Sequence, residues 1–114
     1  MNNIQFAVAS LAFVSLAGCS QHEPTEVTLY RNSPFLIGAR IHWSTFDAVE
    51  DDPNYNANNC AMAARLLNAN MTASAKAEGK ARDPSIGFWC ELGRYEQEGP
   101  VPDSFFAAYP TDVN

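Results

Sequence analysis

The stretch IGFWCEL, residues 86–92, is the part of the sequence that most directly predicts the fold. Apolar residues alternate with other residues along it, and alternation with a period of two is typical of a β-strand. One face carries Cys90 between Phe88 and Leu92, and the opposite face carries Trp89 and Glu91. We therefore expect a strand over residues 86–95 that directs a cysteine toward the core.

A second cysteine lies on a pattern with the period of a helix. One apolar stripe is formed at i, i+3, i+4, i+7 and i+11 by Cys60, Ala63, Ala64, Leu67 and Met71. The spacing predicts a helix over residues 58–71, with Asn58 and Asn59 available as N-caps. Residues 72–85 are expected to form a long loop, with some helix around residues 73–80.

Packing of this helix on the 86–95 strand would bring the sulfurs of Cys60 and Cys90 together. The sequence has three cysteines. If Cys19, near the N-terminus, carries a lipid and the chain is exported, as the N-terminal pattern described below implies, Cys60 and Cys90 remain as a pair, and such a pair predicts a disulfide. Closing that loop would stabilise the fold by about 3.5 kcal/mol on a chain-entropy account. The alternatives are two buried free thiols, or a metal pair with His42 as third ligand, which makes a poor zinc site.

Two further strands are expected before the helix, over residues 26–31 and 36–46, with a break at Asn32-Ser33-Pro34 between them. On the second strand we expect one face to carry Arg40, His42, Ser44 and Phe46, and the other to carry Ala39, Ile41, Trp43 and Thr45. The order β-β-α-β predicts an α+β fold, in which a three-stranded sheet and one helix are linked by the disulfide. If the second and third strands are parallel neighbours, their crossover should be right-handed.

The N-terminal residues resemble the signal peptide of a bacterial lipoprotein precursor. Residues 6–17 are uncharged and apolar, which is long enough for a signal-peptide core and too short for a transmembrane helix. They end in Leu16-Ala17-Gly18-Cys19, which resembles the lipobox of that family. The resemblance implies cleavage before Cys19 and a covalent lipid on Cys19. An ordinary signal peptide, or an uncleaved N-terminus with Cys19 as a free thiol, is the alternative.

The same resemblance implies a location. Ser20 follows the cysteine, and in enteric-type bacteria a residue other than Asp at this position implies sorting to the outer membrane. The chain then divides into a signal peptide (1–18), a lipidated tether (19–25), an α+β domain (26–96) and a Pro- and aromatic-rich C-terminal segment (97–114). The net charge of −6 argues against nucleic acid and anionic membrane surfaces as partners.

Four stretches of the expected domain, LYRNSP, RIHWSTFDA, YNANNC and FWCELGRY, are loosely similar to a group of short bacterial proteins of unassigned function. This similarity implies no activity.

An acidic loop precedes the helix and has part of the spacing of a calcium loop. Side-chain oxygens recur at every second position, in Asp52, Asn54, Asn56 and Asn58. However, alanine stands where a calcium loop has its turn glycine and again where it has its bidentate glutamate. We therefore expect a solvated loop and no metal or other cofactor.

The candidate binding surface is the sheet face opposite the helix, which we expect to carry Arg40, His42, Trp89, Glu91 and Tyr95. Aromatic and Arg side chains are enriched at binding hot spots. In the alternative interpretation the C-terminal segment covers this face, with Phe105, Phe106 and Tyr109 packed on Trp89 as a second layer.

These observations favour a non-enzymatic lipoprotein that binds or supports another component of the cell envelope. A different class is an inhibitor, immunity or phage superinfection-exclusion lipoprotein, whose partner is a toxin or phage factor. A third is a small hydrolase that uses His42, the only histidine outside the tether, with a nearby carboxylate.

Overall fold

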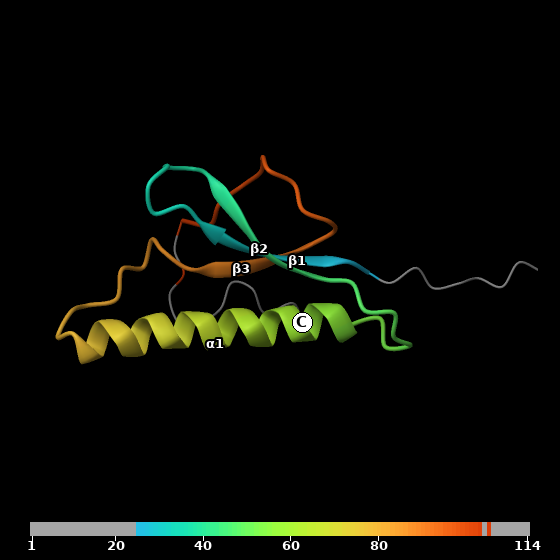
Figure 1. The fold of residues 1–114 in the computed structure, drawn as a ribbon, viewed down its shortest axis with the longest axis horizontal. Helices are drawn as coiled ribbons and strands as arrows, with labels where there is room; N and C mark the ends of the chain where they lie inside the picture. Colours follow the sequence, from blue (N-terminus) through green and yellow to red (C-terminus); the bar gives the residue numbers. More distant parts are fainter. Residues whose placement is uncertain (1–24, 104, 106–114) are drawn as a thin grey trace, which may run out of the picture.

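Three strands and one helix make up the part of the chain that the computed structural model describes, residues 25–103 and 105 (Figure 1). In chain order they are β1 (Val27–Asn32), β2 (Arg40–Phe46), α1 (Tyr55–Ala77) and β3 (Phe88–Leu92). The expected α+β class, with the order β-β-α-β, is confirmed. The lipobox and Cys19 lie outside the described residues.

β1 is the central strand of the sheet. The strand order is β2-β1-β3, and both neighbours run antiparallel to β1. β2 and β3 are therefore parallel to each other but separated by β1, so they are not the neighbouring pair considered above. Residues from Val27 to Tyr30 are at most 1% exposed, which shows that β1 is covered on both faces.

A β-bulge in β2 changes which residues share a face. Leu29 pairs with Ser44 but Tyr30 pairs with His42, so Trp43 is an extra residue in the ladder. Phe46 consequently packs against the core beneath α1, whereas His42 lies beside Tyr30. The expectation that Phe46 shares a face with His42 is wrong, because strict alternation does not continue across an inserted residue.

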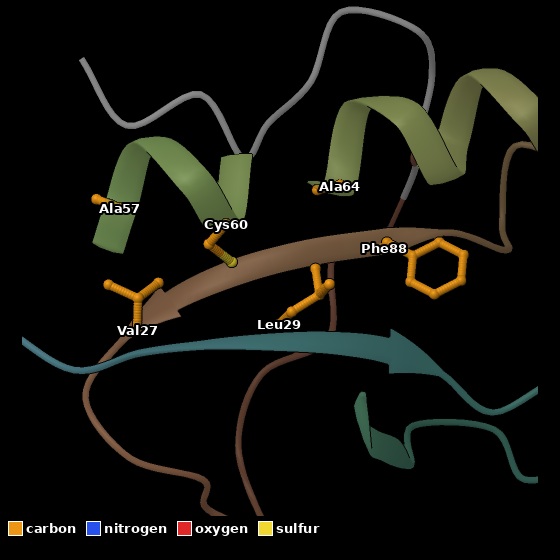
Figure 2. Packing of buried hydrophobic residues seen from close by; sticks show 6 residues of the cluster. All are labelled: Val27, Leu29, Ala57, Cys60, Ala64 and Phe88. Atoms are coloured by element: carbon orange, nitrogen blue, oxygen red, sulfur yellow. The ribbon is translucent and has the colours of Figure 1, made fainter. Parts of the chain in front are cut away.

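The core between α1 and the sheet is built on the cysteine-bearing stripe (Figure 2). Its buried members are Val27, Leu29, Ala57, Cys60, Ala64 and Phe88. Cys60 and Cys90 form a disulfide with their Cα atoms 6.2 Å apart, so the expected link between helix and strand is confirmed.

The helix is longer than the sequence pattern predicted. It begins at Tyr55 and ends at Ala77, so the expectation of a loop from residue 72 is wrong for its first part. Alanine and lysine in this stretch are strong helix formers. The helix stops where Gly79 adopts a positive φ of 71°, and the Lys80 N–H donates to the Ala75 carbonyl at 2.8 Å, which is the C-terminal pattern that glycine permits.

Two buried asparagines join α1 to its surroundings. The Asn56 Oδ1 accepts from the Ala48 N–H at 3.0 Å, and its amide donates to the carbonyls of Thr25 and Ala48. That oxygen is therefore occupied within the fold, and the calcium-loop pattern has a structural cause. Asn68 bonds both backbone groups of Phe88, at 2.9 and 3.0 Å, and so satisfies the outer edge of β3 at that residue.

The C-terminal segment forms a third layer. After β3 the chain crosses the sheet face opposite α1 (Figure 1), and Val101 and Phe105 pack there with Tyr30 and Trp89. The folded body therefore extends past residue 96, the boundary expected from the sequence, to Phe105.

Candidate functional site

The five residues of the expected binding face lie around Tyr30 on the sheet side opposite α1. Tyr30 pairs with His42 of β2 and with Trp89 of β3. The Arg40 guanidinium forms an ion pair with the Glu91 carboxylate. The strand register thus brings the expected residues together. Their burial determines which of them are accessible to a partner.

Trp89 is an interior residue. Its side chain is 4% exposed and stacks on Tyr30, with ring centroids 5.5 Å apart and an interplanar angle of 21°. On its other side the Phe105 ring lies 5.4 Å away. The alternative interpretation, in which the C-terminal segment covers this face, is therefore correct for Phe105, which packs on Trp89. Phe106 and Tyr109 lie outside the described residues.

Arg40 is also committed to the fold. Its Nε–H donates to the Glu96 carbonyl at 2.8 Å, and its guanidinium lies 4.2 Å from the centroid of the Tyr30 ring. The Tyr30 hydroxyl in turn accepts from the Glu96 N–H at 3.0 Å. A Cβ at Gly99 would approach the Arg40 guanidinium to 2.5 Å. Arg40 thus holds the segment after β3 against the sheet, and this face cannot serve as an open surface centred on Trp89 and Arg40.

The exposed residues of the expected face are His42 and Tyr95 at its edge, whereas Glu91 is half-buried in its pair with Arg40. The rings of His42 and Tyr95 are 4.8 Å apart, and the His42 Nε2 lies 2.8 Å from the Thr45 hydroxyl. Neither contact supplies the carboxylate that the hydrolase alternative needs beside His42. Among the described residues, no group of three or more His, Cys, Asp or Glu side chains is placed to hold a metal ion.

Among the described residues, the longest run of exposed large apolar side chains lies elsewhere, in the loop between β1 and β2. Phe35, Leu36 and Ile37 are 90%, 67% and 107% exposed. We call residues 33–39 the tip. Folded domains rarely expose several apolar side chains side by side. Where they do, the apolar patch marks an interaction site.

Hydrogen bonds close the tip into a defined turn. The Ser33 hydroxyl accepts from the N–H groups of Phe35 and Leu36, at 3.2 and 3.0 Å. The Ser33 N–H donates to the Ala39 carbonyl at 2.9 Å, and the Ala39 N–H donates to the Leu36 carbonyl at 3.1 Å. Gly38 makes this turn possible with a φ of 77°, a conformation that side chains disfavour.

The base of the tip is fastened to the segment before β3. The Asn32 Oδ1 accepts from the Gly87 N–H at 2.9 Å, and the Asn32 amide donates to the Ser85 carbonyl. Hydrogen bonds within the tip and between Asn32 and residues 85–87 therefore hold the turn in place, while the apolar side chains of the tip remain exposed.

A groove lies beside the tip, between the tip and the segment before β3. Its volume is about 390 Å³. It is lined by Asn32, Ser33, Pro34, Ile37, Gly38, Asp83, Ser85, Ile86, Val101, Pro102 and Asp103. The tip, the segment before β3 and the C-terminal layer thus meet at one place.

This site was not expected from the sequence, because residues 36–39 were predicted to belong to a strand, whereas β2 begins at Arg40. The signal was present: Asn32-Ser33-Pro34 is a strand breaker, and Gly38 follows the three apolar residues closely. Apolar residues between two such turn signals favour a loop, in which their side chains are exposed.

Comparison with known proteins gives no independent indication of function. No family model matches the chain, and neither curated proteins nor solved structures give a match. Within residues 25–103 and 105, no helix is both long and apolar enough to cross a membrane.

Proposed function

We propose that this protein is a lipid-anchored, non-enzymatic binding component of the bacterial cell envelope, and that the tip is its contact element. The observation that carries the proposal is the exposure of Phe35, Leu36 and Ile37 on a hydrogen-bonded turn. The anchor is the lipid that the lipobox resemblance implies for Cys19, with the outer membrane as the location.

The position of the tip supports this role. The chain enters β1 at Val27, and the tip follows the other end of that strand (Figure 1). The six residues of β1 separate the two ends by roughly 20 Å. A tether of residues 19–25 reaches at most about 25 Å. The tip thus lies at the end of β1 farther from the attachment point, which favours contact with other envelope components over contact with the anchoring bilayer.

Burial of the tip against a partner would supply binding energy. Fully burying one large apolar side chain contributes about 1.5–3 kcal/mol. Because the turn is already closed by hydrogen bonds, less conformational entropy is lost on binding than in a flexible loop. These features favour a partner with an apolar pocket.

The first test is site-specific photo-crosslinking in intact cells, with a photoreactive phenylalanine derivative in place of Leu36. We expect adducts with one envelope protein. The same derivative at Met62, an exposed apolar position on α1 (53% exposed), is the matched control and should give no such adduct. Equal labelling from both positions, or none from position 36, would show that the tip is not a contact element.

The anchor is tested separately by Cys19→Ser. We expect this variant to leave the membrane fraction, because the lipid is attached through that thiol. Membrane fractionation with mass analysis of the N-terminus checks the result. A variant that stays in the membrane with an unchanged N-terminus would contradict the lipoprotein assignment.

A second candidate function uses the same element. A closed, projecting apolar turn is also suited to entering and blocking a cleft of a toxin, phage factor or hydrolase, as an inhibitor, immunity or exclusion lipoprotein would. The identity of the protein captured from position 36 separates the two: a resident envelope protein favours the accessory role, and a toxin or phage protein favours inhibition.

A further inference from the structure

We propose that the groove beside the tip receives a segment of the partner protein that pairs an apolar side chain with a Lys or Arg. This inference rests on the proposed function, because it assigns the chemistry of the partner that the tip contacts. It is carried by the groove's shape, its lining and its charge.

The lining offers an apolar contact surface next to the exposed tip. Ile37 and Pro34 belong to the tip, and Ile86, Val101 and Pro102 come from the two neighbouring segments. A partner that buries Ile37 would therefore extend directly into the groove. At about 390 Å³, the groove is of a size for one or two side chains and not for a folded element.

The charge of the lining is one-sided. Asp83 and Asp103 are its charged residues, and it contains no Lys or Arg. The Ser85 hydroxyl donates to the Asp83 Oδ1 at 2.6 Å and the Ser85 N–H donates to it at 2.9 Å. The hydroxyl bond first, then the backbone bond, and to a smaller extent the charge of Arg82 lower the pKa of Asp83, against a small opposing effect of burial. Its carboxylate is therefore ionised at neutral pH.

The neighbouring cation is directed into the fold. The Arg82 guanidinium donates to the Ile86 carbonyl at 2.8 Å and to the Thr72 hydroxyl at 3.0 Å. It also bonds the backbone carbonyl of Asn68 at 3.3 Å. These bonds engage Arg82 with α1 and the backbone, so its guanidinium does not line the groove, although its charge still interacts with Asp83.

Other occupants fit this charge less well. A second copy of this chain has a net charge of −6, and an anionic bilayer is negative as well, so both would be repelled. The chain's own residues 106–114 contain Asp112 but no Lys or Arg. A cationic segment of another protein is the complementary occupant.

The test uses the full chain in intact cells, with the photoreactive derivative at Ile37 and mass-spectrometric sequencing of the linked peptide. We expect the linked segment to contain a Lys or Arg beside an apolar residue. Asp83→Asn and Asp103→Asn should each lower the adduct yield about two- to fivefold, the range for exposed ion pairs. Asn at position 83 keeps the Oδ1 acceptor for Ser85. Asp51→Asn removes the same charge from an exposed loop distant from the groove and should leave the yield unchanged.

A second readout measures affinity directly. A synthetic peptide with the captured sequence is titrated against the full chain in phosphatidylcholine nanodiscs, beside a version with norleucine in place of its cationic residue. We expect the norleucine peptide to bind about two- to fivefold more weakly, and the double variant Asp83→Asn, Asp103→Asn to abolish that difference.

Several outcomes would overturn the inference. The captured segment could be neutral or acidic, or position 37 could give no adduct. The adduct could instead form with phospholipid, with residues 106–114 or with a second copy of the chain. The adduct yields of the three Asp variants could also be equal. The two proposals fail distinguishably. If position 36 captures a protein while the Asp variants have no effect, only the groove chemistry is wrong. If position 36 captures nothing, the tip is not a contact element.

Discussion

Arg40 is a charged strand residue whose role is structural rather than one of recognition. Its side chain is 4% exposed and pairs with the Glu91 carboxylate, while it also contacts the Tyr30 ring and the Glu96 carbonyl. A buried guanidinium needs such partners because desolvating a charge is costly. The same contacts that satisfy Arg40 hold the C-terminal layer on the sheet.

Removing this side chain should destabilise the protein. We expect Arg40→Ala to lower the free energy of unfolding by about 1.5–3 kcal/mol, because it removes the hydrogen bonds of a charged, buried guanidinium to Glu91 and the Glu96 carbonyl, together with the contact with Tyr30. Urea denaturation measures this change. Arg94→Ala is the control, since the Arg94 side chain is 82% exposed in its pair with Glu26 and should contribute at most about 1 kcal/mol. Equal losses in the two variants would contradict the interior role of Arg40.

At the scale of elements, α1 and β3 are joined by two different kinds of link. The Cys60–Cys90 disulfide is covalent and closes a sequence separation of 30 residues. Asn68 bonds the N–H and carbonyl of Phe88, so it gives the edge strand a partner at that point. Together they fix the helix along the strand that also carries Trp89 on its other face.

Reduction of the disulfide should cost stability at this contact. We expect the free energy of unfolding to fall by about 3.5 kcal/mol, because the unfolded chain gains conformational freedom. Urea denaturation with and without dithiothreitol gives the value. The double variant Cys60→Ala, Cys90→Ala should be equally unstable in both conditions. The prediction fails if the reduced and oxidised wild-type proteins unfold at the same urea concentration.

At the scale of the whole molecule, the described residues form three layers, with the sheet between α1 and the C-terminal segment (Figure 1). One layer is a regular helix, and the other is an irregular segment whose buried aromatic residue is Phe105. This arrangement encloses β1 and leaves the apolar side chains of the tip exposed at one end of the sheet.

Phe105 should therefore matter far more than a phenylalanine in the tip. We expect Phe105→Ala to lower the free energy of unfolding by about 3–5 kcal/mol, the range for a buried phenylalanine, and to shift the emission of Trp89 to longer wavelength in a Trp43→Phe background. Phe35→Ala makes the same chemical change at a side chain that is 90% exposed and should stay within about 0.5 kcal/mol of the parent. A small effect of Phe105→Ala would contradict the third layer.

The sequence alone determined the features that depend on local periodicity. The alternation around Cys90 predicted a strand and the stripe through Cys60 predicted a helix, because side-chain direction follows from backbone geometry. Their apolar faces then predicted the disulfide. The lipobox pattern is equally local, and the anchor remains a prediction on that basis.

Tertiary structure alone decided what is buried. Periodicity places Trp89 and Arg40 on a face but does not say whether a distant segment covers it, and Phe105 does so for Trp89. The bulge at Trp43 and the exposure of the tip likewise depend on pairing with β1 and on hydrogen bonds to residues 85–87. Burial arises from contacts between parts of the chain far apart in sequence, so only the folded molecule showed that three consecutive apolar side chains, at residues 35–37, are exposed.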